Sequence, residues 1–161
     1  MHTGNGAINM KQENIVNEEF LISILEDDGY NIEYIKNPSE EVQLAAVNED
    51  GLAIQYINNT TEKIQLAAVK QDGLAIKYIK NPTDKVQLAA VNEDGFAINY
   101  IKNPSEKMQL AAVKKNGYTI EYIENPSEKV QLAAVKEDGY VIKYIKSPTE
   151  KVLKYIKRRY V

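Results

Sequence analysis

The chain has 161 residues, of which 43% are hydrophobic and 27% are charged, a composition that predicts one folded domain and excludes a disordered chain. It contains no cysteine, which excludes disulfides, thiolate metal sites and a cysteine nucleophile. Twenty basic and 23 acidic side chains give a net charge of −3, so we expect no attraction of the whole molecule to nucleic acid or to an anionic membrane.

Residues 1–17 form a polar leader ahead of a single domain that we place at 18–161. The leader lacks the apolar stretch of a secretory signal, and no apolar run reaches the roughly 18 residues of a membrane span. We therefore expect a cytoplasmic protein without a membrane partner.

The domain is built from an internal repeat of 22 residues. Its period is set by the glycines Gly29, Gly51, Gly73, Gly95, Gly117 and Gly139. The predicted units are 18–36, 37–58, 59–80, 81–102, 103–124 and 125–146, followed by 147–161.

Each unit predicts two helices. Asn37 as N-cap, Pro38 at the first position and Glu40 in a capping box place the start of the first helix near Pro38. This helix ends at Gly51, which either adopts the left-handed conformation of a C-terminal cap or lets Asp50 turn the chain. A second helix of about two turns follows over 52–58.

The apolar residues of both helices cover nearly all sides, leaving for water only the sector around positions 41 and 48 of the first helix and a strip at Gln55 and Asn58 of the second. One hairpin cannot bury such surfaces alone, so neighbouring units must stack. The predicted fold is all-α, an α-solenoid of six two-helix repeats with a C-terminal capping helix. The first unit, with Phe20 in place of Val, and the basic final helix diverge as terminal caps do.

The string Leu-Ala-Ala-Val at 44–47, then Gly51, Tyr56 and Ile57, resembles short tandem repeats of largely uncharacterised proteins of bacteria and large DNA viruses. The hairpin plan is also similar in architecture to HEAT and armadillo solenoids, whose repeats are about twice as long. The resemblance implies a fold and very little about activity, since a fold does not determine function. It suggests a viral or bacterial effector or inhibitor of a host protein, acting in the host cytoplasm if viral.

Residues that carry chemistry are scarce, so we expect no catalytic, cofactor or metal site. The only histidine, His2, lies in the leader, as do Gly4 and Gly6, which lack the pattern of a phosphate loop. Glu49, Asp50 and their copies precede each glycine. Helix capping by Asp is favoured over a row of divalent cations, because no unit supplies the six or more oxygens that calcium requires.

Two further rows recur once per unit. The glutamines, which we expect to be buried and hydrogen-bonded to one another or to loop backbone, are Gln43, Gln65, Gln87, Gln109 and Gln131. The tyrosines, which we expect to pack on the apolar side of their helix rather than stack bases or anchor a partner, are Tyr34, Tyr56, Tyr78, Tyr100, Tyr122 and Tyr144.

Positions that vary between units indicate where a partner docks on a solenoid. We predict a groove of mixed charge along the second helices, on the concave face, for a protein partner. The candidate residues are Lys77, Lys80, Phe96, Asn99, Lys102, Tyr118, Glu121, Tyr140 and Lys143.

The alternative is nucleic acid bound by a row of lysines on the first helices, since regularly spaced cations can follow a phosphate backbone. Neighbouring glutamates and the negative net charge favour a protein partner. The residues of this lysine strip are Lys63, Lys70, Lys85, Lys107, Lys114, Lys129 and Lys136.

Overall fold

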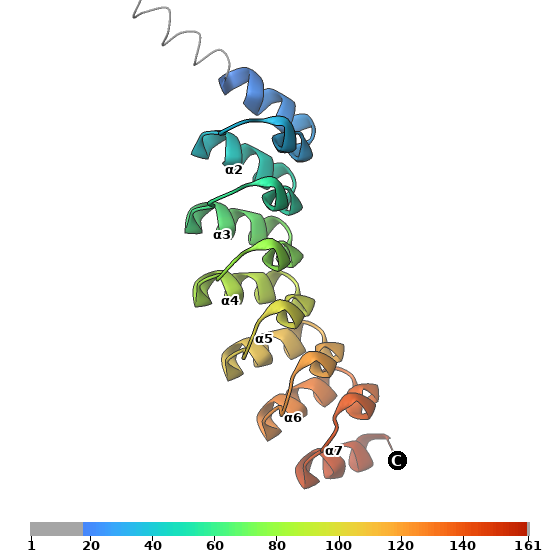
Figure 1. Cartoon of the computed structure of the whole chain (residues 1–161). Helices are drawn as coiled ribbons and strands as arrows, with labels where there is room; N and C mark the ends of the chain where they lie inside the picture. Colours follow the sequence, from blue (N-terminus) through green and yellow to red (C-terminus); the bar gives the residue numbers. More distant parts are fainter. Residues whose placement is uncertain (1–17, 161) are drawn as a thin grey trace, which may run out of the picture.

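The computed structural model describes residues 18–160, and in that range the chain is helical without strands. A helix over 18–27 opens a regular alternation of short α-helices and 3₁₀ helices (Figure 1). The elements are η1 (Gly29–Tyr34), α2 (Glu40–Glu49), η2 (Gly51–Tyr56), α3 (Glu62–Gln71), η3 (Gly73–Tyr78), α4 (Asp84–Glu93), η4 (Gly95–Tyr100), α5 (Glu106–Lys115), η5 (Gly117–Tyr122), α6 (Glu128–Glu137), η6 (Gly139–Tyr144) and α7 (Glu150–Tyr160). The predicted α-solenoid of stacked two-helix units with a final helix is confirmed.

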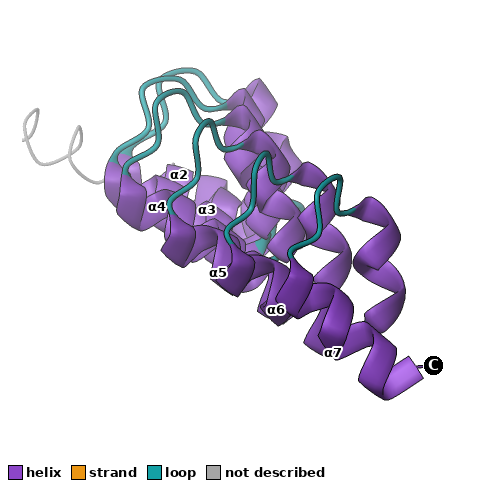
Figure 2. Cartoon of the chain, turned by 90° about the horizontal axis from the view of Figure 1, so that it is seen from below, coloured by secondary structure: helices purple, strands orange, loops and turns teal. Residues whose placement is uncertain are grey.

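The units form two parallel layers, because each α-helix packs on the next α-helix and each 3₁₀ helix on the next 3₁₀ helix. In Figure 1 the stack bends gently, with the 3₁₀ layer on the inner side of the bend. Figure 2 shows the connectors from each 3₁₀ helix to the next α-helix crossing between the layers along one edge. The sides of the stack available to a partner are thus the α layer, the 3₁₀ layer, the connector edge and the opposite edge, where each α-helix turns into its 3₁₀ helix.

The start of the α-helices differs from the sequence prediction. Helix α2 begins at Glu40, and its N-cap is Ser39, whose hydroxyl accepts a hydrogen bond from the Val42 amide at 3.3 Å. Asn37 is not the cap, and Glu40 closes no capping box because it occupies the first helical position. A threonine caps α3 and α4, and a serine caps α5 and α6.

The asparagine has another role. Asn37 has a φ of +52°, and the four equivalent asparagines have φ between 50° and 57°. Asparagine tolerates this left-handed conformation better than other side-chain-bearing residues. It therefore reverses the chain direction two residues before the true cap.

The repeat glycines, all within the described residues, do not adopt a left-handed conformation. Instead Asp50 turns the chain as a single-residue corner, ending α2 and capping η2 by accepting a hydrogen bond from the Leu52 amide at 2.8 Å. Of the two predicted alternatives, the turn at aspartate is therefore confirmed and the left-handed cap is wrong. Glycine is required because a Cβ on Gly51 would lie 2.4 Å from the carbonyl oxygen of Ala68 in the next unit.

The second helix of each unit is a 3₁₀ helix of six residues, shorter and tighter than the predicted two-turn helix over 52–58. It begins at the glycine and ends at the tyrosine, and the following isoleucine has an extended backbone. Because a 3₁₀ helix has three residues per turn, residues three apart lie on the same edge. This geometry decides which side chains reach the surface together.

The core runs unbroken through the stack. In the second unit Val42, Ala46 and Val47 of α2 are buried together with Ala53 and Ile54 of η2. At the first unit Phe20, which replaces the buried valine, is 62% exposed because no unit precedes it in the described chain. The predicted leader lies outside the described residues. None of the described helices is long and apolar enough to cross a membrane.

Candidate functional site: an aromatic face on the 3₁₀ layer

Two rows of side chains run along the 3₁₀ layer, and together they form what we call the aromatic face. The first row holds the second residue of each 3₁₀ helix: Tyr30, Leu52, Leu74, Phe96, Tyr118 and Tyr140. The second row holds the sixth residue: Tyr34, Tyr56, Tyr78, Tyr100, Tyr122 and Tyr144.

Rings of the two rows contact one another between units. Tyr30 meets Tyr56 edge to face with ring centroids 5.9 Å apart, and Phe96 meets Tyr122 in the same way at 6.1 Å. Such aromatic pairs contribute about 0.5–1.5 kcal/mol beyond the area they bury. The aromatic face is therefore held in register by the stacking of the units.

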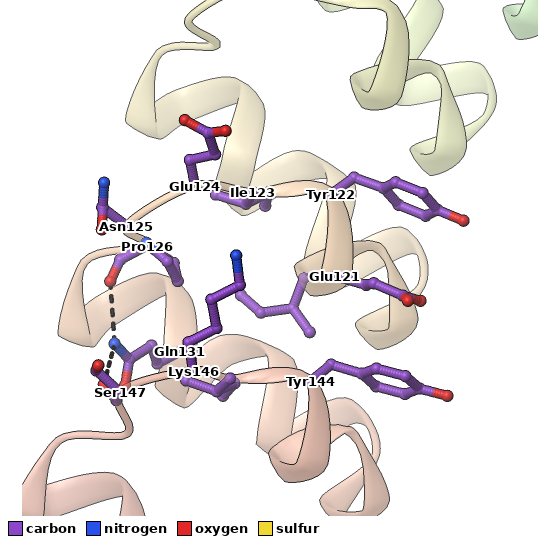
Figure 3. A pocket seen from close by; sticks show the side chains of 12 residues that line it. Glu121, Tyr122, Ile123, Glu124, Asn125, Pro126, Gln131, Tyr144, Lys146 and Ser147 are labelled. Carbon is purple, nitrogen blue, oxygen red and sulfur yellow. Dashed lines mark hydrogen bonds between the residues drawn. The ribbon is translucent and has the colours of Figure 1, made fainter.

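The tyrosines are more exposed than predicted. Tyr56, Tyr78, Tyr100 and Tyr122 of the second row keep 38–48% of their surface accessible, although we expected them to pack against the apolar side. The tyrosine shares an edge with the buried third residue, but it is the last residue of the 3₁₀ helix, and its ring lies against the first row of the preceding unit with its outer side exposed. Figure 3 shows Tyr122 and Tyr144 pointing away from the connectors with their hydroxyl groups outermost.

Charged side chains lie beside the rings. The Lys77 ammonium is 4.6 Å from the centroid of the Tyr78 ring, and Lys143 lies 4.9 Å from that of Tyr144, distances at which a cation is attracted to the ring face. Interaction with Tyr78 raises the pKa of Lys77, so this lysine stays cationic. Interaction with the Asp138 carboxylate raises the pKa of Tyr118, which therefore stays a neutral phenol.

The fifth residue of each 3₁₀ helix shares an edge with the second, because the two are three apart. This position differs in charge from unit to unit, and we call it the variable row. Its members are Glu33, Gln55, Lys77, Asn99, Glu121 and Lys143, all exposed. Along the stack their charges run negative, neutral, positive, neutral, negative, positive.

The nine predicted partner-binding residues are all exposed, but the structure divides them. Lys80 and Lys102 lie on the connectors, and Figure 3 shows the equivalent Lys146 in the hollow between two connectors rather than beside the tyrosine rings. The structure brings the other seven together on the aromatic face: Lys77, Phe96, Asn99, Tyr118, Glu121, Tyr140 and Lys143. Sequence reasoning did not include the exposed tyrosines of the second row among them.

The lysine strip lies on the α layer, where three of its seven lysines pair with glutamates. Lys63 contacts Glu40 of the preceding unit at 2.9 Å, Lys85 contacts Glu62 at 3.0 Å and Lys129 contacts Glu106 at 3.2 Å. Two of these glutamates also accept a hydrogen bond from the next N-cap hydroxyl, Glu62 from Thr83 at 2.9 Å and Glu106 from Ser127 at 2.8 Å.

These contacts hold the pKa of two glutamates below the ordinary value. For Glu62 the larger cause is the hydrogen bond from Lys85, followed by that from Thr83. For Glu106 it is the hydrogen bond from Ser127, followed by that from Lys129. The glutamates that sequence reasoning placed in capping boxes thus link neighbouring units.

The glutamine row satisfies the backbone of the connectors. Gln43, Gln87 and Gln109 each donate to the carbonyl of the proline five residues before, at 2.9 Å. The predicted hydrogen bonding to loop backbone is confirmed, while the glutamines do not bond to one another in the described chain. Most are half-buried rather than buried, and Gln131 is buried at 5% exposure.

Gln131 forms the floor of a hollow of about 550 Å³ between two successive connectors (Figure 3). Its amide nitrogen lies 3.0 Å from the Pro126 carbonyl and 3.3 Å from that of Ser147, and its carbonyl accepts from the Thr149 amide at 3.0 Å. Both the amide nitrogen and the carbonyl of Gln131 are therefore bonded to connector backbone, which fixes this side chain at the floor of the hollow.

Acidic side chains do not converge into a metal-binding group of three within the described residues. Asp50 and its copies serve as caps of the 3₁₀ helices, as favoured from the sequence. Comparison of the chain with protein-family models, with curated proteins and with solved structures finds no match, so the aromatic face is interpreted from its own residues.

Proposed function

We propose that this chain is a non-enzymatic scaffold that binds a protein partner on the aromatic face. The observation that carries the proposal is that rings of both rows of the aromatic face stay well exposed, among them Phe96 at 37%, Tyr118 at 38% and Tyr100 at 48%. Exposed contiguous aromatic surface is typical of protein interfaces, where tyrosine, with few rotatable bonds, contributes strongly to binding. The position beside the rings varies in charge, which is where a solenoid encodes partner choice.

Nucleic acid is the weaker candidate because three lysines of the strip form ion pairs with glutamates of the preceding unit. Exposed pairs of this kind are individually weak and do not prevent binding, but they lower the local positive potential that attracts a phosphate backbone. The idea that the partner is a host factor of a virus or bacterium stays a prediction.

The test is affinity capture from a lysate with the full chain, with and without nuclease. The face variant Tyr100→Ala with Tyr122→Ala removes two exposed rings, and the control Lys114→Glu reverses an exposed charge of the lysine strip on α5. We expect to capture a protein whose recovery is unchanged by nuclease and by the control substitution but is lost with the face variant. Capture that depends on nucleic acid, or that the control abolishes while the face variant retains it, contradicts the proposal.

A further inference from the structure

The variable row changes sign of charge along the stack and is not a uniformly charged surface. Lys77 is followed two units later by Glu121 and three units later by Lys143, and the intervening Asn99 is neutral. We propose, resting on the proposed protein-binding function, that the aromatic face takes an extended peptide with acidic, basic and acidic side chains at matching intervals.

The alternation of charge selects the class of partner. A nucleic acid carries one negative charge per nucleotide and would meet like charge at Glu33 and Glu121. A polypeptide can change sign along its length and avoid both repulsions. Like charges placed opposite each other in an interface cost several kcal/mol, about the scale on which partners are discriminated.

The exposed hydroxyl groups of the second row favour an extended partner backbone. Figure 3 shows the Tyr122 and Tyr144 hydroxyls at the outer rim of the 3₁₀ layer. A helix has already paired its backbone groups internally, whereas an extended chain presents free N–H and C=O groups to such hydroxyls. The tyrosine of each unit then hydrogen-bonds to the peptide backbone, and the variable row selects the charge of the peptide side chains beside it.

The spacing follows from geometry. Packed helices of adjacent units lie about 9 Å apart, and an extended chain advances about 3.3 Å per residue. One unit therefore corresponds to about three peptide residues. A basic side chain opposite Glu121 should lie about six residues from the acid opposite Lys77, and the acid opposite Lys143 about three residues beyond it, in either chain direction.

The test is selection of a displayed random library of peptides about 20 residues long, enough for either spacing below, on the full chain. We expect enriched peptides to share acidic, basic and acidic side chains at intervals of about six and three residues. Selection on Glu121→Lys should replace the basic side chain by an acidic one and leave the other two, while Lys114→Glu should select the same peptides as the original chain.

A synthetic enriched peptide, measured by fluorescence anisotropy, should lose at least about tenfold in affinity for Glu121→Lys and little for Lys114→Glu. Failure to enrich any peptide, a pattern indifferent to Glu121→Lys, or intervals of about twelve and six residues, which a helical partner would give, overturns the inference. Capture of a protein through the tyrosines in the lysate experiment would leave the proposed function standing in that event.

Discussion

Replacement of Gly73 by alanine tests whether the backbone preference of this residue or its packing against the next unit decides stability. Gly73 has no positive φ, so its backbone conformation suits alanine. By local preference alone the substitution should stabilise the fold by about 0.4–1 kcal/mol, because alanine loses less conformational entropy on folding. The tertiary structure predicts the opposite sign.

The reason is the next unit. A Cβ on Gly73 would lie 2.7 Å from both the Ala90 carbonyl oxygen and the Asp94 amide nitrogen. These are backbone atoms of α4 and its corner, which cannot move aside as a flexible side chain can. Overpacking of this kind costs about 1–3 kcal/mol, so after the local gain we expect a net loss of about 1–2 kcal/mol.

Thermal unfolding followed by far-ultraviolet circular dichroism should show a midpoint lower by about 2–8 °C, using roughly 2–4 °C per kcal/mol for a domain of this size. Gly117→Ala is the matched control, since its Cβ would meet only one atom closer than 3.4 Å, the Ala134 carbonyl oxygen at 2.9 Å. It should cost less. A Gly73→Ala protein that melts at or above the original temperature would refute this account of the glycine row.

Three further predictions concern the corners and the contacts between units. Asn81→Ala should destabilise by about 1 kcal/mol because φ is +51°, whereas Asn81→Gly should be neutral or stabilising in urea denaturation; equal losses would contradict a left-handed role. Thr83→Ala should lower the free energy of unfolding by about 1 kcal/mol because it removes the N-cap of α4. An unchanged urea midpoint would contradict Thr83 as the cap and favour Asn81 instead. Because the folded state lowers the pKa of Glu62 and Glu106, their stabilisation is complete above the unfolded pKa and is lost as pH falls through the folded value. The melting temperature should thus drop below about pH 4, less steeply with both residues changed to Gln, and an identical pH profile would count against these contacts.

Local chemistry by itself determined the repeat length, the all-α class and the solvent sector at positions 41 and 48. Those features follow from the order of apolar residues within one unit, which sequence displays directly. The role of Asp50 was also predictable, because a cap is a contact between residues two or three apart. The lysine and glutamine rows were found for the same reason, as recurrences in a single chain.

Only the stacked structure decided what the glycines, the capping-box glutamates and the tyrosines do. Gly73 is required by the backbone of α4 and its corner in the next unit, and Glu62 bonds to residues more than 20 positions later. The exposure of Tyr100 depends on the 3₁₀ form of η4 and on the neighbouring unit. The distance between units is set by close packing across the whole stack, and no periodicity within 22 residues encodes it.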